Sequence, residues 1–235
     1  MTILSGSDRE RALDAVAAIA ERLQDPPPAW VGDSRLRSHD NVADLCLCGG
    51  RTGLAVLFGY LARAFDRDDY ARTAHRFLDD AIDGVAGREM QAALFTGFAG
   101  VAWTLEHLQW LFDDDDDANE EIDAMLDEIL DTSPWSGPFD LTRGLVGLGV
   151  YALERLPRPR ARQCLAKVVA RLGELAETTD AGITWHTTPE LLFGRARDAF
   201  PSGEYNLGIA HGIPGIIAFL GRAYAAGVAE ARPLV

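Results

Sequence analysis

A fourfold repeat constrains the fold of this 235-residue chain more than any other feature of its sequence. Four segments carry the pattern Gly-x-x-Gly directly before an apolar run, and they begin at Gly50, Gly97, Gly144 and Gly212. The first glycines lie 47, 47 and 68 residues apart, so two of the three intervals are identical. A fixed interval of this length is typical of proteins built by repeating one supersecondary unit.

Each repeat pairs two kinds of helix. The runs that follow the glycines, such as LAVLFGYLARAF and IIAFLGRAYAAG, are apolar on nearly every side. Amphipathic helices, with apolar residues at helical spacing on one face, are predicted over residues 7–24, 68–85, 119–131 and 160–177. Because an all-apolar helix must be buried, each amphipathic helix is expected to cover an inner helix from solvent. No segment shows a convincing strand alternation.

Hairpins of an inner and an outer helix are the unit of an α/α toroid, and the predicted fold class is therefore all-α. Closed rings of this kind contain more hairpins than the four found here. We therefore predict one domain over residues 1–235, an incomplete ring that lacks its C-terminal hairpins. Such an open edge would expose apolar surface, which predicts self-association or a completing partner domain.

Charge and composition exclude several classes of partner. The chain has 22 Lys and Arg against 36 Asp and Glu, a formal net charge of −14 that repels nucleic acid and anionic membrane surfaces. Its longest apolar stretch is far shorter than the ~20 residues of a membrane span. Three cysteines are too few for a disulfide framework, and the first 25 residues contain no secretory signal. These features predict a cytoplasmic protein.

The loops before the third and fourth inner helices carry the titratable groups. Asp140 lies four residues before Gly144 with Arg143 adjacent to that glycine, and His211 directly precedes Gly212. Equivalent loops of a toroid lie at one end, so we expect Asp140 and His211 on the same rim, beside the positive ends of helix dipoles. A neutral imidazole there accepts a proton, and a carboxylate orients it or helps to manage a developing enolate.

Structural interpretations of the same residues remain open. A histidine near a helix start often serves only as a hydrogen-bonding group, and an aspartate in such a loop often serves as an N-cap. Arg143 would then be an ion-pair partner of Asp140.

Four segments resemble the lanthionine synthetase C-like (LanC-like) family, the cyclases of lanthipeptide biosynthesis. The most specific is NLGIAHGIPGIIAFL, which is similar to the family's Ala-His-Gly-x-x-Gly segment; the others are FDLTRGLVGLGVYAL, LFTGFAGVAWTLEHL and CGGRTGLAVLFGYL. The resemblance spans residues 45–225 and implies about four of the family's seven hairpins. It also implies Michael addition of a peptide cysteine to dehydroalanine or dehydrobutyrine, with a dehydrated precursor peptide as partner and zinc as cofactor. By this resemblance, His211 matches the family's acid/base histidine and Asp140 its active-site aspartate.

The sequence departs from the family at the zinc ligands. Family members hold zinc with two cysteines and a histidine in Gly-Trp-Cys-x-Gly and Cys-His-Gly segments, and neither segment occurs in this chain. We therefore expect the chain to lack the zinc ligands and not to be a competent cyclase alone. The alternative is a catalytically inactive LanC-like module that binds a peptide or a thiol. A carbohydrate-active α/α barrel is disfavoured because it needs two rim carboxylates, and only Asp140 is clearly placed there.

Other candidate sites give weaker signals. His39, Cys46 and Cys48 form an H-x6-C-x-C cluster, but the spacing of its cysteines is poor for tetrahedral zinc and buried packing is expected. Cys164 is expected in the core.

Two loops have no assigned chemistry. The acidic run Asp113–Asp117 is expected to be a solvated loop that also caps the following helix. Residues 185–189 lie in the lengthened third interval and either shape substrate access or pack around Trp185.

Overall fold

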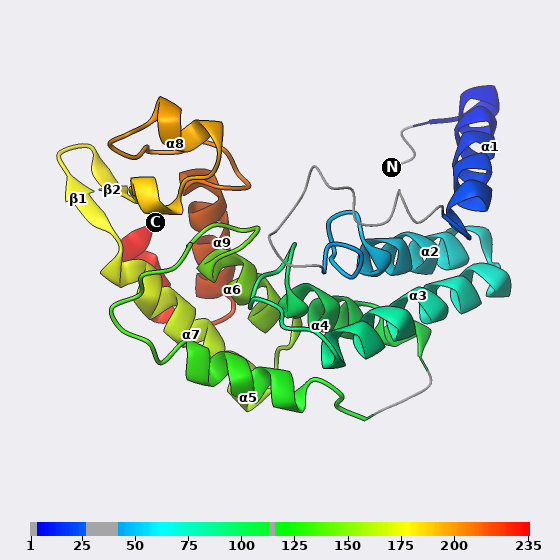
Figure 1. The fold of residues 1–235 in the computed structure, drawn as a ribbon, viewed down its shortest axis with the longest axis horizontal. Coiled ribbons are helices and arrows are strands. Elements are labelled where there is room, and N and C mark those ends of the chain that lie inside the picture. The colour runs from blue at the N-terminus through cyan, green and yellow to red at the C-terminus, as the bar shows by residue number, and fades with distance from the viewer. Residues whose placement is uncertain (1–3, 27–41, 113–115) are drawn as a thin grey trace. The chain divides into compact units, whose positions relative to one another are not determined.

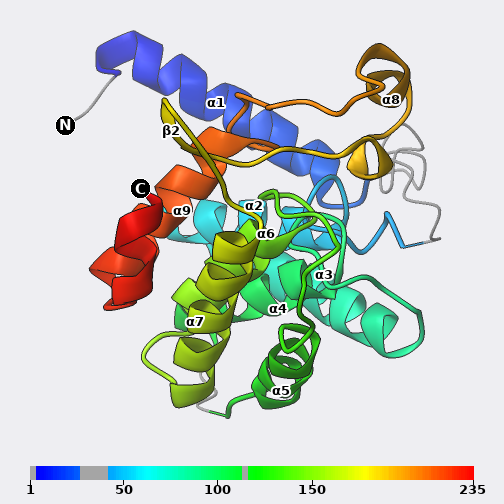
Figure 2. The ribbon, with the colours of Figure 1, turned by 90° about the vertical axis from the view of Figure 1, so that its left-hand side faces the viewer.

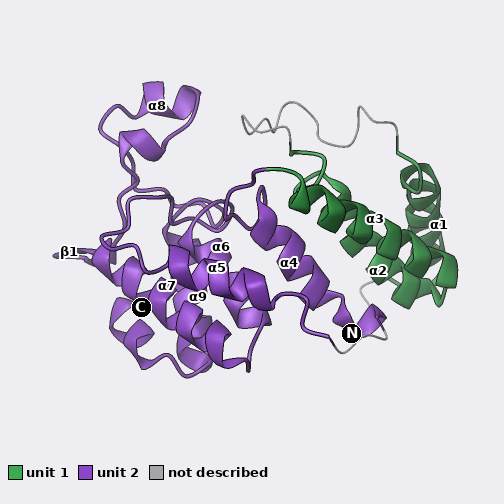
Figure 3. Ribbon diagram, turned by 60° about the horizontal axis from the view of Figure 1, so that its bottom comes forward, with its two compact units in different colours: residues 1–88 green, residues 89–235 purple. Residues whose placement is uncertain are grey.

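The computed structural model describes residues 4–26, 42–112 and 116–235. These residues form two compact units, residues 1–88 and residues 89–235, shown in different colours in Figure 3. The single domain over residues 1–235 stays a prediction, and each unit is described by itself.

Unit 1 contains three helices in its described part: α1 (Gly6–Leu23), α2 (Arg51–Phe65) and α3 (Asp68–Ala86). Helices α2 and α3 are joined by a short connection and pack against each other (Figure 1). The Phe58 ring of α2 is fully buried and lies 5.7 Å from the Tyr70 ring and 5.8 Å from the Phe77 ring of α3, measured between centroids. This aromatic contact joins the inner and outer helices of the first hairpin.

Unit 2 contains the other three inner helices and their covers. Its elements are α4 (Phe98–His107), α5 (Glu120–Ile129), α6 (Leu145–Glu154), α7 (Pro159–Glu174), β1 (Glu177–Thr179), β2 (Gly182–Thr184), α8 (Arg195–Ala199) and α9 (Ile213–Ala225), with 3-10 turns at Gln109–Leu111, Pro189–Leu191 and Ala229–Leu234. The apolar helix α6 packs against α4, α7 and α9, and Figures 1 and 2 both show it among these helices. The amphipathic helix α7 buries one face against α6 and α5.

All four inner helices begin through the same turn. Gly50, Gly97, Gly144 and Gly212 are the N-cap residues of α2, α4, α6 and α9. In each case the first helical N–H donates to the carbonyl seven residues earlier, at 2.8–3.2 Å; the accepting residues are Asp44, Gln91, Pro138 and Asn206. The repeat seen in the sequence is therefore a repeated loop-to-helix turn.

Glycine is required in this turn by a close approach of backbone. A Cβ atom added to Gly212 would lie 2.0 Å from the carbonyl oxygen of Asn206, and one added to Gly144 would lie 2.3 Å from that of Pro138. Both separations are far inside van der Waals contact. Any side chain at these positions would displace the loop.

A small hairpin departs from the expected all-helical pattern. The helix predicted over residues 160–177 ends at Glu174, and β1 then pairs antiparallel with β2, with Glu177 opposite Thr184. The sequence did not indicate this hairpin because β1 is exposed along its whole length and carries no apolar alternation. Directly after β2 in the sequence, Trp185 is buried, and its indole N–H donates to the Leu172 carbonyl at 2.8 Å. This supports the interpretation that Trp185 is a packing residue.

None of the described helices combines the length and the apolar composition that crossing a membrane requires.

Candidate active site

The loops before α4, α6 and α9 are linked to one another by backbone hydrogen bonds. Phe95 N–H donates to the Thr142 carbonyl at 3.0 Å, and Leu141 N–H donates to the Ala210 carbonyl at 3.2 Å. The N-terminal ends of these three inner helices therefore converge within unit 2. This convergence brings together Asp140 and Arg143 from one loop and His211 from the next.

Asp140 is held rigidly by its own loop. Its Oδ1 atom accepts hydrogen bonds from the Thr142 N–H at 2.7 Å, the Thr142 hydroxyl at 2.8 Å and the Arg143 N–H at 2.8 Å. The residue is buried. The N-cap of α6 is Gly144, so Asp140 does not have the N-cap role that the sequence left open; it closes the loop before that helix, with its second oxygen facing His211.

His211 approaches this carboxylate through one ring nitrogen. Its Nδ1 lies 3.5 Å from Asp140 Oδ2 and 3.3 Å from Thr142 Oγ1. The Thr142 hydroxyl hydrogen is directed to Asp140, so both neighbouring oxygens act as acceptors toward Nδ1. The arrangement favours the tautomer with hydrogen on Nδ1 and a lone pair on Nε2. The side chain is 54% exposed, so the imidazole is accessible to a substrate.

The Arg143 guanidinium approaches the same oxygen of the carboxylate as His211 does. Its Nη2 atom is 3.8 Å from Asp140 Oδ2, and its Cζ atom lies 3.7 Å from the centre of the Phe193 ring. Burial lowers the pKa of Arg143, and the negative charge of Asp140 opposes that shift. The site thus combines a fixed carboxylate, an exposed imidazole and a half-buried guanidinium.

Sequence reasoning identified these three residues but not two of their partners. Thr142 bridges Asp140 and His211, and the Asp-x-Thr pattern of a side-chain-closed turn was an available signal. Phe193 contacts Arg143 from 50 residues away in the sequence, and no local pattern indicates that contact.

The described residues do not fit a zinc site. Across residues 4–26, 42–112 and 116–235, no three His, Cys, Asp or Glu side chains are grouped to hold a metal ion. The partners of Asp140 and His211 are a hydroxyl and a guanidinium, and a fixed cation disfavours metal binding beside it. Of the weaker metal candidates, His39 lies outside the described residues, and Cys46 is buried with its thiol directed to the Val42 carbonyl.

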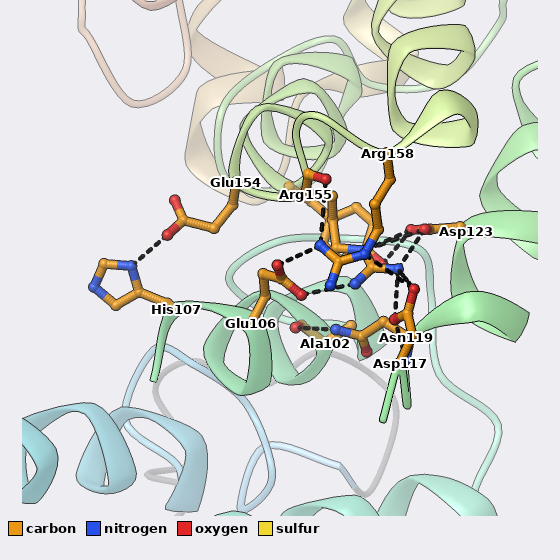
Figure 4. Close-up of polar contacts among 10 residues, drawn as sticks. Ala102, Glu106, His107, Asp117, Asn119, Asp123, Glu154, Arg155 and Arg158 are labelled. Atoms are coloured by element: carbon orange, nitrogen blue, oxygen red, sulfur yellow. Dashed lines mark hydrogen bonds and ion pairs between the residues drawn. The ribbon is translucent and has the colours of Figure 1, made fainter. Parts of the chain in front are cut away.

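A second polar cluster lies at the C-terminal ends of α4 and α6 (Figure 4). Its centre is Arg155, a fully buried guanidinium that pairs with Asp123 at 2.6 Å, Glu106 at 2.7 Å and Asp117 at 2.8 Å. Arg158 contacts Glu106 and Asp117 at 2.6 and 3.0 Å. This cluster ties α4, α5, the C-terminal end of α6 and the segment before α5 together.

The cluster corrects the interpretation of the acidic run. Residues 113–115 lie outside the described part of the chain, but Asp117 is an ion-pair partner of Arg155 and not merely a solvated charge. Its Oδ1 also accepts the Asn119 N–H at 3.2 Å, next to the start of α5. Burial works to raise the pKa of Asp117, but hydrogen bonding to Arg155 and the charges of Arg155 and Arg158 outweigh it and hold the pKa below its usual value.

Comparisons with known proteins agree with this architecture. A family model described as "Lanthionine synthetase C-like protein" matches residues 41–231. Among solved structures, the chain is similar to one titled "Nisin cyclase", with 18% sequence identity and a TM-score of 0.65. That match covers 97% of this chain and 57% of nisin cyclase, so this chain spans little more than half the length of that protein. The search of curated proteins finds no match.

At this level of identity the structural likeness concerns the fold alone. It confirms the predicted all-α fold class, because nisin cyclase is a helical toroid and the described helices follow the same architecture. The family is shown separately, by a model that matches most of the chain. This chain therefore belongs to the lanthionine synthetase C-like family, whose members bind zinc.

Proposed function

We propose that this chain serves in thioether ring formation, by adding a cysteine thiol of a dehydrated precursor peptide to dehydroalanine or dehydrobutyrine. The observation that carries the proposal is the 3.5 Å approach of Asp140 Oδ2 and His211 Nδ1 at converging helix N-termini. Membership of the LanC-like family gives the class of substrate.

The addition needs a group that moves a proton. Sulfur bonds to the β-carbon of the dehydro residue, the double-bond electron pair moves toward the carbonyl, and an enolate results. A proton then joins the α-carbon, so the net change is addition of S–H across the double bond. His211 Nε2 is suited to this transfer, and Asp140 orients the ring.

The surroundings favour the negative charge that develops on the enolate. The N-terminal ends of α4, α6 and α9 direct backbone N–H groups and partial positive charge toward the loops that converge here. Arg143 adds a full positive charge next to Asp140. Such preorganised groups stabilise an oxyanion without rearranging during the reaction.

Zinc supplies thiol activation in the family, by lowering the pKa of the sulfur it binds. Because the described residues do not fit a zinc site, no step is assigned to the metal here. The proposal concerns proton transfer by this chain's own residues.

The test uses a dehydrated peptide that contains one cysteine and one dehydroalanine. Cyclisation leaves the mass of the peptide unchanged but removes its free thiol. Alkylation therefore adds mass only to the uncyclised peptide, and mass spectrometry then measures the fraction that has cyclised. At about pH 8 a peptide thiol is already partly ionised, and the contribution of His211 is therefore measurable without metal activation. We expect His211→Ala to slow thiol loss by about a hundredfold, with His75→Ala of α3 as the control. Equal rates for wild type and His211→Ala would refute the proposal.

A peptide-binding module without catalysis is the second candidate. It is favoured by large apolar side chains that stand exposed in the loop before His211: Tyr205, Leu207 and Ile209. Calorimetric binding of the same peptide with no loss of thiol would establish this alternative. We also propose a cytoplasmic location, because three cysteines are an odd number, too few for a disulfide framework, and fit a reducing compartment.

A further inference from the structure

Residues 188–203, here called the flap, form a loop that is closed at its base. Thr187 and Glu204 pair across the base through two backbone hydrogen bonds of 2.9 Å each. The flap therefore leaves and rejoins unit 2 at one point between β2 and α9, and Figure 1 shows α8 within it. The flap occupies most of the extra length in the third repeat interval.

The flap is internally ordered. It contains a 3-10 turn over Pro189–Leu191 and the short helix α8. The Arg197 side chain joins the two by donating to the Pro189 carbonyl at 3.1 Å and the Glu190 carbonyl at 2.9 Å. These bonds make the flap a preformed unit that would move as one piece about its base.

The flap reaches the candidate site through one aromatic ring. Phe193 is 58% exposed, yet its ring lies flat enough against Arg143 to place the Cζ atom 3.7 Å from the ring centre. This is a cation–π contact. The same guanidinium lies 3.8 Å from Asp140 Oδ2, the oxygen that faces His211. A continuous chain of contacts therefore runs from the flap to the imidazole.

We propose that Phe193 and Arg143 form a latch, which seats the flap beside the site and fixes the guanidinium next to Asp140. Arg143 is then a positioning residue, since a guanidinium keeps its proton at any physiological pH and cannot carry one in the reaction. The importance of the latch for thioether formation rests on the proposed function. The latch itself can be measured without substrate.

The first measurement follows cleavage of the native chain by trypsin after Arg195 and Arg197, resolved by mass spectrometry. Phe193→Leu keeps an apolar side chain but removes the ring, so the flap leaves its seat more often. We expect cleavage about two- to fivefold faster, the factor that an exposed cation–π contact supplies. Phe193→Trp should restore the wild-type rate. Phe200→Leu changes another exposed aromatic of the same flap, 44% exposed, and is the matched control.

The second measurement follows the site itself by NMR. The ¹⁵N signals of the His211 ring report its hydrogen bonding at Nδ1, and we compare them at one fixed pH. Phe193→Leu should shift these signals because the released guanidinium no longer keeps its positive charge beside Asp140 Oδ2, the oxygen that faces His211 Nδ1. Phe193→Trp and Phe200→Leu should leave them at their wild-type positions. A flap contact with only a structural role would not reach the imidazole.

The latch is wrong if Phe193→Leu matches Phe200→Leu in either measurement. It is also wrong if Phe193→Trp fails to restore the trypsin rate. Failure of the proposed cyclase function would appear in the peptide assay, where His211→Ala would not change the rate of thiol loss. The latch and the cyclase function are therefore tested separately.

Discussion

At the scale of single residues, the two carboxylate oxygens of Asp140 have different partners. Oδ1 closes the loop by accepting three hydrogen bonds from Thr142 and Arg143, and Oδ2 lies toward His211 and the Arg143 guanidinium. The same side chain therefore builds the loop and orients the imidazole. A purely capping aspartate would not need a histidine opposite its second oxygen.

Thr142 provides a test of this arrangement that leaves the charges in place. Thr142→Val removes the hydroxyl that donates to Asp140 and lies 3.3 Å from His211, while two backbone N–H groups still hold Asp140. We expect the free energy of unfolding to fall by about 0.5–1.5 kcal/mol, measured by urea denaturation. Thr142→Ser keeps the hydroxyl and should lose less. If the two variants unfold alike, the hydroxyl contributes nothing to the loop.

At the scale of elements, the sequence predicted the inner helices well because two signals agreed. The Gly-x-x-Gly pattern marks the turn, and the apolar run that follows it marks a helix buried on several sides; α2, α4, α6 and α9 begin directly after their first glycines. The approach of Asp140 and His211 then followed from the expectation that equivalent loops share one end. What the sequence pattern could not show was why the glycines are needed. A Cβ atom would collide with a carbonyl six residues earlier at Gly97, Gly144 and Gly212, and with the backbone of Cys46 at Gly50.

The structure of the lengthened third repeat interval could not be predicted from apolar periodicity. The strands β1 and β2 are three residues each and mostly exposed, and α8 has only five residues, so none has an apolar period to detect. The contact between Phe193 and Arg143 depends on where the flap folds back in space. Long-range contacts of single side chains leave no periodic trace in a sequence.

The role of the repeated turn can be tested with two glycines of the same helix. Gly212→Ala places a Cβ 2.0 Å from the Asn206 carbonyl oxygen, and the loop that carries His211 must shift. We expect a loss of about 1–3 kcal/mol in the free energy of unfolding. Gly221→Ala, within α9, adds a Cβ with no atom within 4 Å and should stabilise the chain by up to about 1 kcal/mol. Equal effects of the two substitutions would contradict the close-approach argument.

At the scale of the whole molecule, the inner helices of unit 2 have two dissimilar ends. The loops that hold Asp140 and His211 precede the N-terminal ends of α6 and α9, whereas the C-terminal ends of α4 and α6 meet at the Arg155 cluster (Figure 4). The cluster lies away from the proposed chemistry and joins α4, α5 and α6. The sequence did not reveal it, because its charges are spread from residue 106 to residue 158 in segments that each looked solvated.

Arg155 should therefore matter for stability and not for proton transfer. Arg155→Met fills similar space but leaves the Asp123 carboxylate buried without its arginine partner, and we expect the free energy of unfolding to fall by about 3–5 kcal/mol. Arg160→Met, an exposed arginine at the start of α7, should change the free energy of unfolding by less than about 0.5 kcal/mol. A similar small effect of both variants would show that the cluster is not a structural anchor.

The cluster also predicts how stability depends on acid. The pKa of Asp117 is lower in the folded chain than its usual value, so this carboxylate stabilises the fold above the usual value, and the contribution disappears as the pH falls through the lowered pKa. Asp117→Asn removes the charge at every pH. The difference in unfolding free energy between wild type and Asp117→Asn should therefore be largest near about pH 6 and shrink below about pH 4.

Urea denaturation at several pH values measures this difference, and the other carboxylates of the cluster cancel because both proteins contain them. Asp180→Asn, in the exposed turn between β1 and β2, is the control and should give a difference close to zero throughout. A difference for Asp117→Asn that stays constant down to about pH 2.5 would mean that Arg155 and Arg158 do not favour the charged form of this carboxylate. The stabilisation assigned to its ion pairs would then have to come from hydrogen bonds that an asparagine also makes.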